Sequence, residues 1–374
     1  MNSSSAMPVG LDQTIPSLEK ENMLEIDTLL QVAVEHKASD IHLATGMAPV
    51  FRLHGLLKPQ EQFPVLTPVM LDNILKKMVN IEQQTRFWET GELDFIYSVP
   101  EIGRFRVNAF KQQGSIGVAL RWIGMRIPSL AELTLPKIIE DFTHKTKGLI
   151  LVTGPSGSGK STTLAMMVDL INSEQRCHII TLEDPIEYVH QHKKSVVHQR
   201  EIGSDSLSFA NALRAALRQD PDVILVGEMR DLETITTAIT AAETGHLVMA
   251  TLHTASAAQT IDRIIDTFPA YQQRQIRIQL ADCLEGIIAQ QLLPRQDKLG
   301  RVAVTEVLVA TPAIKNLIRE GKTHQILSAI QTGGKYGMQS LDASLRKLYQ
   351  EGKISREIIQ ARFADSKLTY EIQG

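Results

Sequence analysis

The segment 154–161 reads GPSGSGKS and matches the phosphate-binding pattern G-x-x-x-x-G-K-[ST] at every defined position. Glycines in such a loop adopt backbone angles that other residues resist, and they let the chain approach a polyphosphate closely. Backbone N–H groups and the positive end of the following helix then bind the phosphates. We therefore predict nucleotide contacts from Gly154, Pro155, Ser156, Gly157, Ser158, Gly159, Lys160, Ser161 and Thr162.

The residues on both sides of this loop fit the same function. Residues 149–152 form an apolar run typical of a buried strand, and residues 162–171 carry apolar side chains at helical spacing. The loop pattern by itself occurs by chance in only about one chain in a hundred of this length. In the expected complex with ATP, Lys160 contacts the β- and γ-phosphates and the Ser161 hydroxyl ligates Mg²⁺.

Carboxylates follow two apolar strands predicted in the second half of the chain. Residues 222–226 predict a buried strand that leads to Glu228, a candidate general base, while Gly227 stands where an aspartate for magnesium is usual. The pair Glu183 and Asp184 follows another predicted strand and could hold Mg²⁺ through water in place of that aspartate. The alternatives are a solvated glutamate at a strand end and an ordinary surface turn.

Two histidines lie in the segment 244–254. His246 and His253 are seven residues apart, which is not the i, i+4 spacing of a helical zinc pair, so we exclude a metal site there. His253 ends a predicted strand and could donate a hydrogen bond to the γ-phosphate or to the attacking water. His246 could cap the preceding turn, and both interpretations remain open.

A row of arginines is predicted in the first half. Polar and apolar residues alternate strictly over residues 103–110, which places Arg104 and Arg106 on one face of a strand. Arg121 lies on the next predicted strand. The row is either a solvated basic face or a set of arginine fingers that stabilise charge on a γ-phosphate. Because the linker that follows is short, a neighbouring subunit is the expected recipient.

Composition narrows the class of protein. At 374 residues, with 43% hydrophobic and 22% charged residues, the chain is expected to form two or three globular domains. The net charge of −3 gives no basic field for nucleic acid, and the two cysteines form neither a disulfide framework nor a zinc motif. No apolar stretch reaches the roughly 20 residues of a membrane span, and no signal pattern is present, so we expect a cytoplasmic protein without membrane insertion.

Periodicity and turn residues predict the domain organisation. The expected divisions are a flexible tail over 1–20, a first domain over 21–122, a linker over 123–135 and an ATPase domain over 136–374. The first domain is expected to contain helices over 24–35, 68–79 and 81–90, strands over 41–43 and 50–53, and a β-rich stretch over 93–122.

Strands and helices alternate in the second half, which predicts an α/β fold with a mostly parallel sheet and helices on both faces. The expected strands cover 148–153, 178–182, 223–226 and 247–251, and the expected helices begin at Lys160 and cover 207–218 and 233–243. After residue 251, apolar helical segments are expected to continue to about residue 363.

The motifs together resemble the secretion ATPases of type II and type IV systems and, among them, the pilus retraction ATPases. The resemblance covers nearly the whole chain after about residue 20. The residues that carry it are the loop 154–161, ITLEDPIEY at 180–188, GE at 227–228, the segment 244–254, ASDIHL at 38–43, the segment 103–110, AIKNLIRE at 313–320, QTGG at 331–334 and GMQSLD at 337–342. Two positions depart from the family pattern, Ser156 in place of threonine and Lys315 in place of arginine.

The resemblance implies an N-terminal PAS-like α+β domain, a C-terminal RecA-like P-loop ATPase domain and a homo-hexameric ring. It also implies that hydrolysis of ATP with Mg²⁺ drives pilus disassembly and twitching motility, at an inner-membrane platform protein on the cytoplasmic face of the membrane. A paralogous retraction ATPase is a further expected partner. The chain itself is then either the primary retraction motor or such an accessory motor.

Other functions fit the sequence less well. Pilus-assembly and secretion ATPases usually carry a four-cysteine zinc module and a long extra N-terminal domain, and neither is found in this sequence. A P-loop kinase would have its phosphate loop near the N-terminus, whereas more than 150 residues precede the loop here. A DNA motor is not favoured, because the charge balance is acidic and no groove of basic and aromatic residues is predicted.

A helix near the C-terminus is a candidate for coupling hydrolysis to motion. Thr311 and Pro312 are typical of a helix start, and Ile314, Leu317 and Ile318 then form one apolar stripe. This stripe either packs into the core or transmits movement to a partner.

Overall fold

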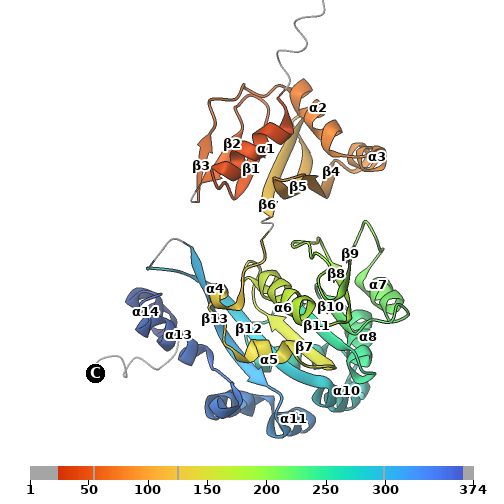
Figure 1. Ribbon diagram of the computed structural model, residues 1–374, viewed down its shortest axis with the longest axis vertical. Helices are drawn as coiled ribbons and strands as arrows, with labels where there is room; N and C mark the ends of the chain where they lie inside the picture. Colours follow the sequence, from red (N-terminus) through yellow and green to blue (C-terminus); the bar gives the residue numbers. More distant parts are fainter. Residues whose placement is uncertain (1–23, 54, 124–125, 298–299, 365–374) are drawn as a thin grey trace, which may run out of the picture. The chain divides into compact units, whose positions relative to one another are not determined.

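The computed structural model describes residues 24–53, 55–123, 126–297 and 300–364, and side chains as far as residue 360 (Figure 1). The chain folds into two compact units, Met1–Met125 and Arg126–Gly374. The tail expected over residues 1–20 lies outside the described residues. No described helix combines the length and the apolar character needed to cross a membrane.

The first unit is an antiparallel sheet with helices packed on it. Its sheet has the strand order β3-β2-β1-β6-β5-β4, and helices α1 and α2 bury their apolar sides in the common core (Figure 1). The elements are α1 Ile26–Glu35, β1 Asp40–Leu43, β2 Val50–Leu53, β3 Leu56–Pro59, α2 Pro68–Met78, α3 Ile81–Thr90, β4 Glu92–Val99, β5 Gly103–Gln112 and β6 Ser115–Ile123. This is the expected α+β domain. The exposed edge strand β3 was not expected, because its sequence LLKP has no alternation of apolar and polar residues.

Local signals explain where the helices of this unit begin and end. The Thr67 side chain caps α2, whose first residue is Pro68. Asn80 and Gln83 form a capping box at the start of α3, and Gly91 ends that helix in the left-handed conformation with φ 81°. Helices α2 and α3 therefore begin where the sequence indicates, and α3 also ends there.

The second unit carries a mixed sheet with the strand order β13-β12-β7-β11-β10-β8-β9, in which only β12 and β13 pair antiparallel. The helices are α4 Leu130–Leu133, α5 Ile138–Thr143, α6 Lys160–Glu174, α7 Phe209–Ala216, α8 Leu232–Glu243, α9 Ala257–Asp266, α10 Ala270–Cys283, α11 Pro312–Arg319, α12 Ile326–Thr332, α13 Leu341–Gln350 and α14 Arg356–Ala364. The strands are β7 Gly148–Thr153, β8 His178–Glu183, β9 Val196–Glu201, β10 Val223–Val226, β11 Leu247–Leu252, β12 Leu284–Pro294 and β13 Arg301–Val309.

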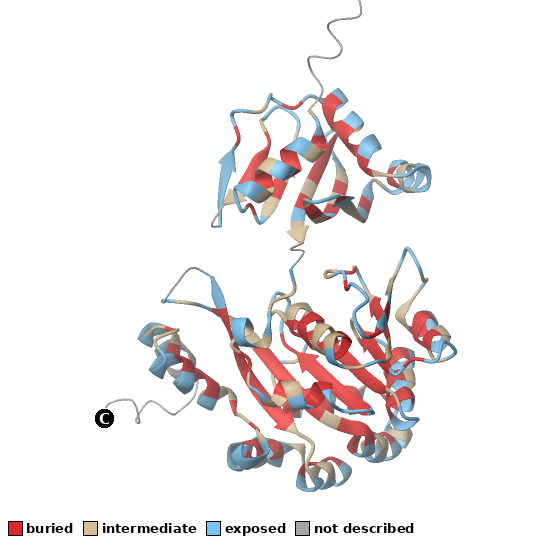
Figure 2. Cartoon of the chain, in the orientation of Figure 1, coloured by how far each residue is buried: buried red, intermediate tan, exposed pale blue. Residues whose placement is uncertain are grey.

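The central strands of this sheet are buried on both faces. Leu149 and Leu151 of β7 pack into a core with α7 to α10, whereas Ile150 and Val152 pack into a second core with α5 and α6. Figure 2 shows the central strands β7, β10 and β11 in the colour of buried residues. Strands covered on both sides read as continuous apolar runs rather than alternating ones, and this explains why β7, β10 and β11 appear in the sequence as short apolar runs.

Three expectations differ from the structure. The segment 123–135, predicted as an irregular linker, begins with the last residue of β6 and contains helix α4, which Ser129 and Glu132 start with a capping box. Residues 124–125 of that segment lie outside the described residues. Residues 284–294 and 301–309, predicted as helical, form the strands β12 and β13, and strand β9 was not predicted. A short apolar run has no periodicity to separate a buried strand from a buried helix, so pairing with β7 decides the structure of β12.

Candidate nucleotide-binding and catalytic site

The phosphate loop connects the end of β7 to helix α6, as its sequence predicts. Gly154 has φ 147° and Gly159 has φ 87°, and Gly159 precedes the first residue of α6. A Cβ at Gly154 would lie 2.1 Å from the carbonyl oxygen of Gln290, so no larger residue fits there. The loop therefore has the backbone conformation and the helix position that bind a polyphosphate.

Lys160 reaches back over this loop. Its Nζ donates hydrogen bonds to the carbonyl oxygens of Gly154, at 2.8 Å, and Pro155, at 3.1 Å, and the residue is 8% exposed. Burial lowers the pKa of the ammonium group, although the negative charges of Glu228 and Glu187 oppose this shift. A bound phosphate would supply the nearby negative charge that the ammonium group lacks.

Glu228 follows strand β10, close to the side chains of Arg230 and His253. Its Oε1 lies 2.7 Å from Nε of Arg230 and 3.2 Å from Nε2 of His253. Burial raises the pKa of Glu228, but the hydrogen bond from Arg230 and the charges of His253 and Arg230 outweigh it and hold that pKa below its usual value. The carboxylate is therefore ionised at neutral pH, as a general base must be.

The parallel sheet explains why these residues meet. Strands β10 and β11 are neighbours and run in the same direction, so the segments that follow them, with Glu228 and His253, lie at the same edge. The N–H of Met229 donates to the carbonyl oxygen of Thr251 at 3.1 Å and ties the two segments together. Gly227 packs against β8, where a Cβ would lie 3.0 Å from the carbonyl oxygen of Leu182, which leaves little room for an aspartate.

Glu183 and Asp184 lie at this edge as well, but they differ in their surroundings. The Oε1 of Glu183 accepts hydrogen bonds from Thr181, at 2.7 Å, and Gln199, at 3.2 Å, and burial raises the pKa of this carboxyl group to about 7. Asp184 is exposed and precedes Pro185 in a cis peptide. In the described part of the chain, no group of three or more histidine, cysteine or acidic side chains is arranged to hold a metal ion. The magnesium role of the pair stays a prediction.

The two histidines of the segment 244–254 lie at opposite ends of β11. His246 precedes the strand, and its Nδ1 lies 3.0 Å from the carbonyl oxygen of Ala241 at the end of α8. Its backbone N–H donates to the same oxygen. His246 thus caps the turn before β11, whereas His253 follows β11 beside Glu228.

The predicted arginine row lies on one face of the sheet in the first unit. Arg104 and Arg106 alternate with the buried residues of β5, and Arg121 of β6 pairs directly with Arg106. The Nε of Arg121 donates to Oδ1 of Asp40 at 2.9 Å, and Arg52 lies 3.7 Å from the other oxygen. The side chain of Arg106 is exposed, whereas that of Arg121 is held by Asp40. The action of these arginines on a nucleotide stays a prediction.

Three functional candidates escaped the sequence analysis. Arg230 was not selected, although a cation two residues after the predicted base is a usable signal. Tyr188 lies with its hydroxyl 3.0 Å from Oγ1 of Thr162, and it was noted only as part of a motif. Gln290 contacts the phosphate loop from a strand that is distant in the sequence, so no local pattern could indicate it.

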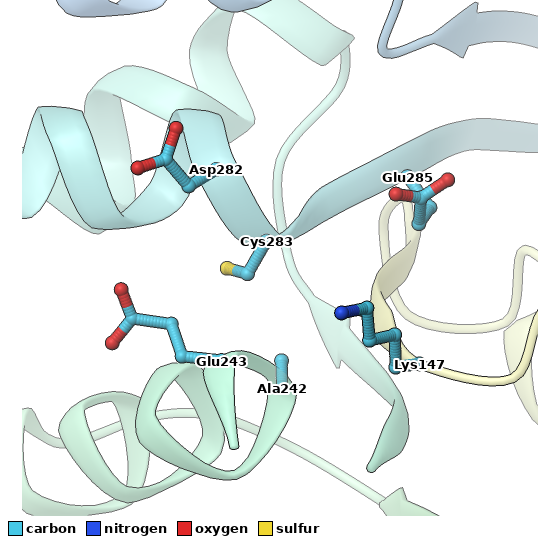
Figure 3. Close-up of a pocket in the computed structure, with 7 residues that line it drawn as sticks. Lys147, Ala242, Glu243, Asp282, Cys283 and Glu285 are labelled. Atoms are coloured by element: carbon cyan, nitrogen blue, oxygen red, sulfur yellow. The ribbon is translucent and has the colours of Figure 1, made fainter. Parts of the chain in front are cut away.

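A pocket lies away from the phosphate loop (Figure 3). This pocket has a volume of about 280 Å³, and Lys147 and Gly148 at the start of β7 line one side of it. Glu243, Asp282 and Glu285 line other parts, around the buried Cys283. Because the phosphate loop follows the other end of β7, this pocket is separate from the nucleotide site.

A family model described as "Type II/IV secretion system protein" matches residues 19–360. The chain belongs to this family. It is 48% identical over 334 residues to the type IV pilus "retractation" ATPase PilT of Pseudomonas aeruginosa, a match that covers 89% of this chain and 96% of the relative. It is also 42% identical over 334 residues to the type IV pilus ATPase PilU of the same organism, covering 89% of this chain and 87% of that protein.

The solved structure of a relative confirms the fold of this chain. The crystal structure of the pilus retraction motor PilT with bound ADP is 50% identical in sequence and superposes with a TM-score of 0.85. The match covers 89% of this chain and 95% of that one. The N-terminal α+β domain and the C-terminal RecA-like domain are therefore those of this ATPase family.

The contact between Arg230 and Glu228 predicts a shift in pH dependence. In Arg230→Gln the carboxylate loses a cation, so the pKa of Glu228 should rise and the base should stay protonated to a higher pH. The acidic limb of the profile of kcat for ATP hydrolysis against pH should move to higher pH. Arg214→Gln, which removes an exposed ion pair with Glu233, is the matched control. An unmoved limb in Arg230→Gln would show that this contact does not tune the base.

Proposed function

We propose that this chain is a Mg²⁺-dependent ATP hydrolase that powers the retraction of type IV pili. The observation that carries the proposal is the position of Glu228 and His253 at the same sheet edge as an intact phosphate loop. The similarity to a pilus retraction ATPase over most of both chains supports the choice of task. The lower identity to PilU makes the accessory motor the second candidate.

Each group of residues has its own role in the proposed hydrolysis. The phosphate loop and Lys160 bind the β- and γ-phosphates, and Glu228 orients a water and accepts its proton. The hydroxyl of Ser161 and the carboxylates of Glu183 and Asp184 are hard oxygen donors, which suit Mg²⁺. A bound magnesium ion would neutralise charge that develops on the phosphates.

A ring of identical subunits would let the arginines of one subunit act on the nucleotide of another. Arg104, Arg106 and Arg121 belong to the first unit, whereas the phosphate loop belongs to the second. In a homo-hexamer the first unit of one subunit can deliver its arginines to the nucleotide of the next. The proposed assembly works at the cytoplasmic face of the inner membrane, on a platform protein at the pilus base.

Helix α11 is the proposed element that passes movement to the pilus base. Ile314 and Ile318 are buried in the core, whereas Leu317 is only half-buried. On its polar side, Lys315 donates to the carbonyl oxygen of Asp282 at 3.2 Å, and Arg319 pairs with the carboxylate of the same residue. The helix is thus tied to the junction of α10 and β12 and keeps one apolar side chain partly exposed.

Two substitutions test the hydrolase proposal. Lys160→Ala removes the charge that faces the phosphates, so ATP binding and turnover should both be lost. Glu228→Gln keeps the shape but accepts no proton, so ATP should still bind while kcat falls roughly 10²–10⁴-fold. Calorimetry and a phosphate-release assay measure the two effects. Near-normal hydrolysis in both variants would refute the function.

Mixed rings test the arginine assignment. Arg104→Ala should lower the ATPase rate without unfolding the first domain. A subunit with Arg104→Ala still has an intact phosphate loop, and a subunit with Lys160→Ala still has its arginines. Mixing the two should therefore restore part of the ATPase activity that each lacks alone. If mixed hexamers form, as shown by mass photometry, and no mixing ratio restores activity, the arginines do not act between subunits.

A pair of substitutions on one helix tests coupling. Leu317→Ala should leave ring assembly and most ATPase activity intact and abolish twitching in cells. Ile318→Ala is the matched core control and should lower the free energy of unfolding by about 2–5 kcal/mol, because Ile318 is fully buried. Melting temperature, ATPase rate and twitching are measured for both. Normal twitching in Leu317→Ala would reject the coupling role.

A further inference from the structure

Gln290 of β12 lies against the phosphate loop with both ends of its side-chain amide occupied. Its Nε2 donates to the carbonyl oxygen of Ser158 at 2.7 Å, and its Oε1 accepts from the hydroxyl of Thr163 at 2.8 Å. Gln290 is 3% exposed and Thr163 is 1% exposed, so water does not compete for either bond. One side chain thus joins the loop to the first turn of α6.

The backbone of Gln290 approaches the loop just as closely. A Cβ added at Gly154 would lie 2.1 Å from the carbonyl oxygen of Gln290. A Cβ added at Gly159 would lie 2.8 Å from Nε2 of the same residue. Contact with the backbone of Gln290 therefore requires a glycine at position 154, and the side chain of Gln290 also lies against Gly159. The sequence pattern of the loop and the residue Gln290 belong to one packing arrangement.

The bond to Ser158 also sets the direction of a phosphate-binding group. In a trans peptide the C=O and the following N–H point in opposite directions. When Gln290 holds the carbonyl of Ser158, the N–H of Gly159 points away from β12. Such N–H groups are the ones that a phosphate loop offers to an anion. Without this bond, the carbonyl is free to turn outward and present negative charge to the phosphates.

We propose that Gln290 is a positioning residue that holds the phosphate loop in its nucleotide-binding conformation. This role rests on the proposed ATP hydrolase function and adds a residue from outside the motif to that site. Gln290 touches no phosphate itself. It acts through the peptide between Ser158 and Gly159 and through the hydroxyl of Thr163.

The experiment measures the Kd for ADP by calorimetry on the full chain. Gln290→Leu keeps the volume and removes both hydrogen bonds, so the Kd should rise about tenfold or more, because it leaves the buried carbonyl of Ser158 without a partner. Gln291→Leu, which changes the same residue type on the opposite face of the strand, is the matched control and should bind ADP as the wild type does. Melting temperatures show that each variant is folded.

Gln290→Glu separates a positioning role from simple packing. A buried carboxyl group is neutral at low pH and can then donate to the carbonyl of Ser158, as the amide does, whereas the ionised form cannot. Its Kd relative to that of the wild type should therefore recover as the pH falls from about 8 to about 6. Gln290→Leu should show no such recovery. A role that depends on side-chain volume alone predicts a normal Kd in Gln290→Leu, which keeps that volume.

A double-mutant cycle with Thr163→Val adds a second check. Because both residues act through one bridge, the combined rise in Kd with Gln290→Leu should be smaller than the product of the two single effects. A wild-type Kd in Gln290→Leu, or no pH recovery in Gln290→Glu, would overturn the role of Gln290. If the wild-type chain itself fails to bind ADP, the proposed function falls instead, so the two failures are distinguishable.

Discussion

The phosphate loop must turn its N–H groups toward a polyphosphate while its buried carbonyl groups still have hydrogen-bond partners. Two side chains meet this requirement. Lys160 takes the carbonyls of Gly154 and Pro155, and Gln290 takes that of Ser158. Lys160 belongs to the motif, whereas Gln290 comes from a strand more than a hundred residues further along the chain. The conformation of the loop therefore depends on the completed sheet.

The direction of the strands arranges the rest of the second domain. Carboxyl ends of β7, β8, β10 and β11 meet at one edge, and the phosphate loop, Glu183, Glu228 and His253 follow them there. The opposite edge holds the charged pocket of Figure 3 and its links to α11. Strand β12 runs between these edges, from Glu285, which lies 3.7 Å from Lys315, to Gln290 beside the loop. One continuous strand thus contacts both the phosphate loop and α11.

The contacts of Glu228 have two opposite effects on a candidate general base. Glu228 is ionised because Arg230 and His253 stabilise its negative charge, and the same contacts make it a weaker base. A nucleotide that draws Arg230 toward its phosphates would raise the pKa of Glu228. Arg230 is largely exposed, so it is the cation that can move more easily.

The sequence by itself determined the chemistry of the phosphate loop, the candidate base and the alternation that aligns Arg104 with Arg106, because these depend on neighbours in the chain. It also marked the strands β7, β10 and β11, whose apolar runs are bounded by turn residues. Only the tertiary structure decided that the apolar run 284–294 is a strand, since pairing with β7 and not periodicity separates strand from helix there. It alone brought Gln290 to the loop and His253 to Glu228. Contacts between residues distant in the sequence leave no local pattern, and their geometry exists only once the sheet has formed.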